Sequence, residues 1–139
     1  MPLPIQIGAQ SLDLSPRVFK SETVVASPAA AAETIICSVV VGGDLATALG
    51  VAVIGWATYT VGTNGVSVLF KIRRTDASGA TVTASGAETA TAAALESKLI
   101  LGVDDGQVAA RQVYVLTMTV ASGSAESAVS AAPLLAIAV

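Results

Sequence analysis

The feature that most constrains this sequence is an alternation of apolar and polar residues with a period of two, which dominates from Glu33 onward. Successive side chains of a β-strand point to opposite faces, so this alternation indicates strands with one buried face. The predicted strands cover residues 35–41, 51–63, 66–75, 80–84, 99–103, 112–121, 125–131 and 134–139. About eight strands, with turns roughly every 8–15 residues, predict an all-β fold, an antiparallel β-sandwich or jelly roll.

The strongest turn signal is Asn64-Gly65, which lies between two of these strands. A two-residue type I′ turn needs positive φ at both central positions, and Asn-Gly meets that need best. A hairpin closed there places Tyr59 opposite Phe70 on the predicted core face. On the other face it places Trp56 opposite Arg73, and the two side chains can stack.

Other segments carry weaker signals. Residues 76–79 predict a turn, and Ser122-Gly123-Ser124 predicts a hairpin into the next strand. The β-branched run 35–41 predicts a strand buried on both faces, and the apolar run 134–139 predicts a strand inside the sheet. Residues 85–98 leave two interpretations open, because their alanines favour a short helix whereas their threonines and the neighbouring strands favour irregular structure or an edge strand. We prefer the second.

Residues 1–32 are predicted to form an extended N-terminal arm and linker, and residues 33–139 the sandwich domain. Prolines punctuate the arm, and proline disfavours both helix interiors and central strands. The arm is too apolar for a typical disordered tail. It can dock on its own domain, on a neighbouring subunit or on a larger scaffold, and its candidate interface residues are Leu3, Ile5, Ile7 and Phe19.

The composition favours burial against other molecules. Hydrophobic residues make up 53% of the chain and charged residues only 12%, whereas a typical domain has about 25% charged residues. So little charge on the outside suits burial between subunits. The alternative is a surface coated with Ser and Thr, on which small residues raise the mean hydropathy to +0.75. We expect the first.

The residue types that most enzymes use are scarce. There is no histidine, which removes the commonest general base, the usual serine and cysteine triads and the commonest metal ligand. Asp104-Asp105 is the only adjacent acidic pair, and we expect a solvated turn there rather than a Ca²⁺ site. Cys37, in mid-strand, is expected to be a small core residue rather than a nucleophile. We therefore expect no enzyme activity, no catalytic residues, no cofactor and no metal.

Charge and hydropathy argue against binding to nucleic acid and against insertion into a membrane. The net charge is −3 and the chain has no basic stripe, which nucleic-acid binding needs. Lys71 and Arg73 share a face of their strand and predict a solvated or intersubunit charged patch. The longest weakly polar run, 45–57, is shorter than the roughly 20 residues of a spanning helix, and the N-terminus lacks the features of a signal peptide. We expect no nucleic acid, no membrane and no secretion by a signal peptide.

Trp56 raises a second class of function. It lies on the outer face of the predicted hairpin, where an aromatic ring can stack on a sugar. The chain has one Trp, two Tyr and two Phe, few for an aromatic platform, so packing of Trp56 against Arg73, the arm or a neighbour is favoured. A carbohydrate- or surface-binding β-sandwich module is the alternative function.

Two segments resemble a known group of proteins. They are Gly-Trp-Ala-Thr-Tyr-Thr-Val-Gly-Thr-Asn-Gly at 55–65 and Gln-Val-Tyr-Val-Leu-Thr-Met-Thr-Val at 112–120, the latter followed by Ser-Gly-Ser and a last apolar strand. Over residues 33–139 the chain is similar to small jelly-roll virion proteins of tailed phages, of the capsid decoration (cement) or head-fibre type. The resemblance implies a trimer or another symmetric homo-oligomer on a capsid shell, attached by the N-terminal arm. It also implies synthesis in the host cytoplasm and a place on the virion surface. A structural assembly protein is therefore the expected function.

Overall fold

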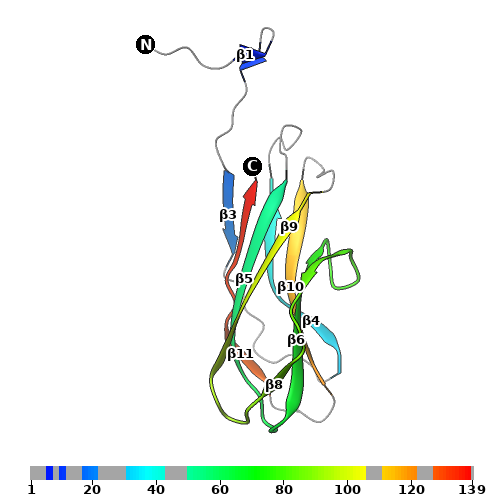
Figure 1. Cartoon of the computed structure of the whole chain (residues 1–139), viewed down its shortest axis with the longest axis vertical. Coiled ribbons are helices and arrows are strands. Elements are labelled where there is room, and N and C mark those ends of the chain that lie inside the picture. Colours follow the sequence, from blue (N-terminus) through cyan, green and yellow to red (C-terminus); the bar gives the residue numbers. More distant parts are fainter. Residues whose placement is uncertain are drawn as a thin grey trace.

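The structure is a computed structural model, and it describes residues 6–7, 10–11, 17–21, 31–42, 50–105, 111–121 and 127–138. Strands are the only regular elements in these residues. Ten of them form two five-stranded antiparallel sheets, packed face to face (Figure 1). The predicted all-β antiparallel sandwich is confirmed.

One sheet, called here the β5 sheet, consists of β3 (Arg17–Ser21), β5 (Val51–Thr60), β9 (Glu96–Asp104), β11 (Ala128–Ala131) and β12 (Leu134–Ala138). Its strands lie in the order β9, β5, β12, β3. β11 and β12 lie end to end along the same edge of β5, β12 beside its first half and β11 beside its last residues. The sheet therefore has four strand positions. The predicted C-terminal strand does lie inside it, between β5 and β3.

The second sheet, the β10 sheet, consists of β4 (Glu33–Val41), β6 (Val66–Arg74), β7 (Thr81–Ala84), β8 (Glu88–Ala90) and β10 (Gln112–Val120). Its order is β4, β10, β6, with β7 and β8 one after the other along the outer edge of β6. The two sheets thus contain ten strands in eight strand positions, whereas the sequence predicts about eight strands. A two-stranded ribbon, β1 (Gln6–Ile7) and β2 (Gln10–Ser11), is a sheet of its own.

The core lies between the sheets and is built from alternate residues of the long strands. Tyr59 of β5 and Phe70 of β6 meet across it, with ring centroids 5.2 Å apart and the rings tilted by 56°. Alternate residues of β10 are fully buried, namely Tyr114, Leu116, Met118 and Val120. Cys37 is buried too, as expected of a core residue. Each buried Val, Leu, Ile, Phe or Met contributes about 1.5–3 kcal/mol, so this layer supplies most of the stabilisation.

The hairpin predicted at Asn64-Gly65 is wrong, because β5 and β6 belong to different sheets. Gly65 has a φ of +73°, whereas Asn64 is not among the residues with positive φ, so the type I′ geometry is not formed. The Asn64 side-chain oxygen instead accepts from the Ala92 amide at 2.6 Å, and the Gly65 amide donates to the Ala90 carbonyl at 3.0 Å. The turn is an arch that carries the chain across the sandwich.

Two further expectations are wrong for related reasons. β10 and β11 lie in different sheets, so no hairpin joins them; residues 122–126 themselves lie outside the described residues. β4 is an edge strand with an exposed outer residue, Val40, rather than a strand buried on both faces. Ile36 is the extra residue of a β-bulge against β10, which explains why Ile36 and Cys37 are buried in succession.

The ambiguous segment 85–98 forms no helix. It contains β8, a left-handed residue at Ala93 with φ of 57°, and the start of β9. This confirms the preferred interpretation. The turn predicted at 76–79 joins β6 to β7, and there the Asp76 carboxylate accepts hydrogen bonds from the amide and hydroxyl of Ser78, each at 2.8 Å.

Part of the predicted arm is an edge strand of the β5 sheet. β3 pairs with β12 along its whole length, and Phe19 is half-buried against the core. Leu3 and Ile5 lie outside the described residues, and Ile7 is in β1. The division at residue 32 and the docking role of the arm stay predictions.

Candidate interaction surface

The outer face of the β5 sheet is apolar over most of its area. Pairing between strands arranges its residues in rows across the sheet. Val103, Ala52, Ile137 and Val18 form one row, from β9 to β3. Leu101, Ile54, Leu135 and Lys20 form the next, and Leu99 and Trp56 begin a third. We call these ten residues the apolar face.

Much of this face is open to solvent. The described residues contain seven exposed large hydrophobic side chains, and five of them belong to the apolar face: Val18 (61%), Trp56 (52%), Leu99 (64%), Leu101 (61%) and Val103 (63%). Monomeric soluble proteins rarely expose contiguous apolar patches larger than a few hundred Å². This exposed apolar face is therefore the candidate interaction site.

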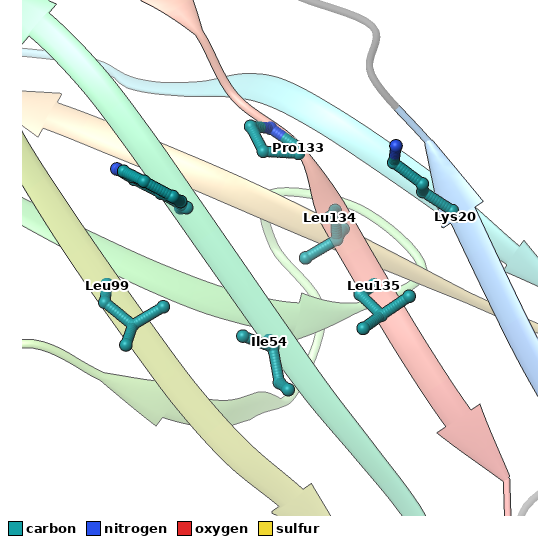
Figure 2. Close-up of a pocket in the computed structure, with 7 residues that line it drawn as sticks. Lys20, Ile54, Leu99, Pro133, Leu134 and Leu135 are labelled. Atoms are coloured by element: carbon teal, nitrogen blue, oxygen red, sulfur yellow. The ribbon is translucent and has the colours of Figure 1, made fainter.

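A groove runs along the apolar face. It has a volume of about 250 Å³, and Figure 2 shows Leu99, Ile54 and Leu135 projecting from three neighbouring strands around it, with Lys20 at its far side. Its complete lining is Lys20, Ile54, Trp56, Leu99, Pro133, Leu134 and Leu135. Since Lys20 is the only charged or hydrogen-bonding side chain apart from the indole of Trp56, the groove suits an apolar occupant.

The opposite outer face, on the β10 sheet, carries a charged cluster around Glu33. Its carboxylate accepts from Arg73 Nε at 2.6 Å, Arg73 Nη2 at 3.0 Å, Lys71 Nζ at 3.3 Å and the Thr117 hydroxyl at 2.6 Å. These bonds, chiefly those from Arg73, outweigh partial burial and lower the pKa of Glu33 from 4.5 to about 2. The cluster ties β4, β6 and β10 together.

The sequence-predicted site residues are therefore divided between two faces. Trp56 lies in the apolar face, whereas Lys71 and Arg73 lie on the other sheet and bind Glu33. The stacked pair of Trp56 and Arg73 is wrong, because it depended on the hairpin.

Sequence reasoning missed the β9 contribution to the apolar face. Leu99, Leu101 and Val103 alternate with Ile100 and Gly102, so the pattern is apolar on both faces. The alternation therefore gave no sign of which side is outward.

A second polar cluster joins the two sheets at one end of the sandwich. Asp104, at the end of β9, is only 4% exposed. Its carboxylate accepts from Arg74 Nε at 2.7 Å and from the Tyr114 hydroxyl at 2.7 Å, and Arg74 Nη2 also bonds to it. Burial and this carboxylate raise the pKa of Tyr114. The solvated turn expected at Asp104 is wrong, although Asp105 is exposed.

Within the described ranges, every buried side-chain nitrogen or oxygen has a hydrogen-bond partner. The same ranges hold no group of three or more side chains placed to bind a metal ion. They also hold no helix with the length and hydropathy to cross a membrane. The polar clusters that are present connect strands to one another.

The comparisons with known proteins show the fold. No protein-family model matches the sequence, and no curated protein matches it significantly. The chain is similar to part of VP2 of infectious bursal disease virus in its subviral particle, with a TM-score of 0.61 and 13% identity over 100% of this chain and 37% of that one.

Two further structures of the same virus agree. The T13 viral particle gives a TM-score of 0.58 at 13% identity over 99% of this chain and 39% of that one. The Gx strain gives 0.56 at 14% identity over 100% and 38%. These neighbours are viral capsid proteins with a jelly-roll-like fold. The chain spans little more than a third of their length, and at this identity the similarity is one of fold alone.

Proposed function

We propose that this chain is a structural subunit of a virion and works by contact rather than by catalysis. The observation that carries the proposal is the apolar face. Five large apolar side chains on one sheet face are each more than half exposed, and covering them with another protein surface gains about 25 cal/mol for each Å² removed from water. The function is then the formation of an interface.

Two other observations support this role. A fold shared with a viral capsid protein over the whole chain is compatible with a particle subunit. Five charged side chains of the described strands form ion pairs between strands, since Glu33 binds Arg73 and Lys71 while Asp104 binds Arg74. Groups held in such ion pairs are poorly placed to act on a substrate.

The more specific proposal is a capsid decoration protein of a tailed phage. It draws on the resemblance of segments 55–65 and 112–120 to such proteins. On this proposal the chain forms a trimer or another symmetric oligomer on the virion surface, with its N-terminal arm as the attachment. Mass spectrometry of purified virions and immunogold labelling should then find the chain on the outside of the particle. Its recovery only from the soluble fraction of infected cells would contradict the proposal.

Attachment by the arm is tested by truncation. Because β3 belongs to the β5 sheet, the cut belongs between residues 16 and 17, and not at residue 30. A chain of residues 17–139 should fold but co-sediment with particles at least tenfold less than the full chain. Equal occupancy by both chains would show that the arm is not the attachment.

The carbohydrate-binding alternative is not favoured by the groove beside Trp56. Binding sites for small ligands combine apolar walls with several polar groups that fix the ligand's orientation, and here the polar side chains of the lining are Lys20 and the indole of Trp56 alone. Glycan-array binding that is lost on Trp56→Ala, with the fold retained, would reverse this judgement.

A further inference from the structure

We propose that the apolar face is covered by the same face of a second copy of this chain, in a two-fold symmetric, face-to-face pair. The inference rests on the proposed function in one respect, namely that the chain is an assembly subunit. It selects a symmetric pair over the trimer that the resemblance implies.

The size of the face is the first argument. β5 has 10 residues, so the face is about 34 Å long, and its four strand positions make it about 19 Å wide. Because β3 has only 5 residues, its strand position is about 17 Å long. Pairing two such faces therefore covers roughly 570 Å² on each copy, or roughly 1,150 Å² in total, above the roughly 1,000 Å² that a specific interface needs. The apolar face fills the larger part of this area, and the rest is filled by Thr58, Thr60, Ser97 and the exposed β11 residues Ala128 and Ala131.

The charge pattern is the second argument. Among the outward residues of the described strands of this sheet, Lys20 is the one charged side chain, and none is acidic. A charged partner surface would therefore form few ion pairs with this face, whereas an equally apolar surface would be complementary to it. Lys20 lies on β3, at the edge of the sheet, so its stem can cover apolar surface while its ammonium group stays in water.

The arrangement of the strands is the third argument. The exposed side chains of β9 flank the groove on one side, and those of Val18 and Lys20 on β3 flank it on the other. A two-fold axis along the strand direction lays β9 of each copy over β3 of the other, and β5 over β12. The exposed Leu101 then meets the aliphatic stem of the partner's Lys20, and Ile54 meets Leu135. A two-fold contact requires one patch to complement itself, and in this pairing apolar side chains or an aliphatic stem meet on both copies.

Trp56 is an intrinsic fluorescent probe of this contact. Trp56 is the single tryptophan, it lies in the apolar face, and it is 52% exposed in the isolated chain. Its fluorescence therefore reports whether this face, and no other, is covered.

The experiment measures mass and fluorescence of the full chain together. Sedimentation equilibrium should give a dimer, and on dilution the Trp56 emission should shift to the red, with more acrylamide quenching, at the concentration where the mass halves. Leu101→Lys should raise the dissociation constant at least tenfold. Val40→Lys is the matched control, because Val40 is also an exposed large hydrophobic residue, at 42%, but lies on β4 in the β10 sheet, and it should leave the constant within twofold.

Three results would overturn the inference. They are a monomer at all concentrations, a trimer, and a dimer in which Trp56 emission does not depend on concentration. A monomer whose binding to particles is weakened by Leu101→Lys would assign the face to the capsid and leave the proposed function intact. A dimer that behaves as expected, from a chain absent from virions, would instead uphold the pairing and contradict the proposed function.

Discussion

Asp104 shows how one charged residue can hold two sheets together. It ends a strand of the β5 sheet, while its partners Arg74 and Tyr114 belong to the β10 sheet. A buried carboxylate is costly unless paired and hydrogen-bonded, and here both conditions are met. No pattern in the sequence distinguishes Asp104 from its neighbour Asp105, because only the tertiary contact buries one and exposes the other.

Asp104→Asn should therefore destabilise the protein by about 2–3 kcal/mol, since it leaves the partly exposed Arg74 guanidinium without its counter-charge. Urea unfolding followed by circular dichroism measures the change. Asp105→Asn is the control and should stay within about 0.5 kcal/mol of the wild type. Equal effects of the two substitutions would show that the inter-sheet ion pair contributes little.

Glu33 should make stability depend on acid. Its pKa is lowered in the folded state, from 4.5 to about 2, so its contribution is complete above pH 4.5 and is lost as the pH falls towards 2. Because the cluster is partly solvated, we expect a loss of about 1–2 kcal/mol across this window. Urea unfolding at several pH values should show a flatter profile for Glu33→Gln; parallel profiles would contradict the assignment.

At the scale of elements, the sequence predicts strands and their faces better than it predicts their partners. The strand limits agree to within about three residues for the long strands, and the inward faces of β5 and β6 are as predicted. Asn64-Gly65 does reverse the chain. A hairpin and an arch both need such a reversal, and both bring Tyr59 near Phe70, either as neighbours in one sheet or across the core.

The two arrangements differ in long-range pairing, which local sequence does not encode. β5 pairs with β9, β11 and β12, all of them distant in the chain. For the same reason the candidate site was predicted only in part. Trp56 is found on an outer face as expected, but its neighbours there come from β9, β12 and β3.

The contact between β7 and β9 can be tested at Gly102. A Cβ atom at this position would lie 2.7 Å from Thr83 Cγ2 and 2.9 Å from its Cβ, so Gly102→Ala should cost about 1–3 kcal/mol through overpacking. Adding Thr83→Ala should recover part of that loss in a double-mutant cycle. Gly86→Ala is the control, because its Cβ meets nothing within 4 Å. Purely additive effects would mean that the two strands do not touch there.

At the scale of the whole molecule, β12 completes the β5 sheet. It pairs with β5 on one side and β3 on the other, and it buries Leu134, Ala136 and Ala138. A chain that stops at residue 133 should therefore be unfolded, whereas residues 17–139 should fold. Far-UV circular dichroism and the dispersion of amide signals in NMR spectra distinguish these outcomes. A folded 1–133 chain would show that β5 and β3 need no strand between them.

The place of β12 also sets an order on folding during synthesis. β3 pairs with β12 alone, and from β3 to β6 each strand lies in the sheet opposite to the one before it. A nascent chain can thus form few of its final pairings early, because loop closure over long separations must come first. Until the ribosome has made residues 134–138, β3 and the β12 side of β5 have unpaired edges. Such edges can pair with other nascent copies, which favours aggregation during expression.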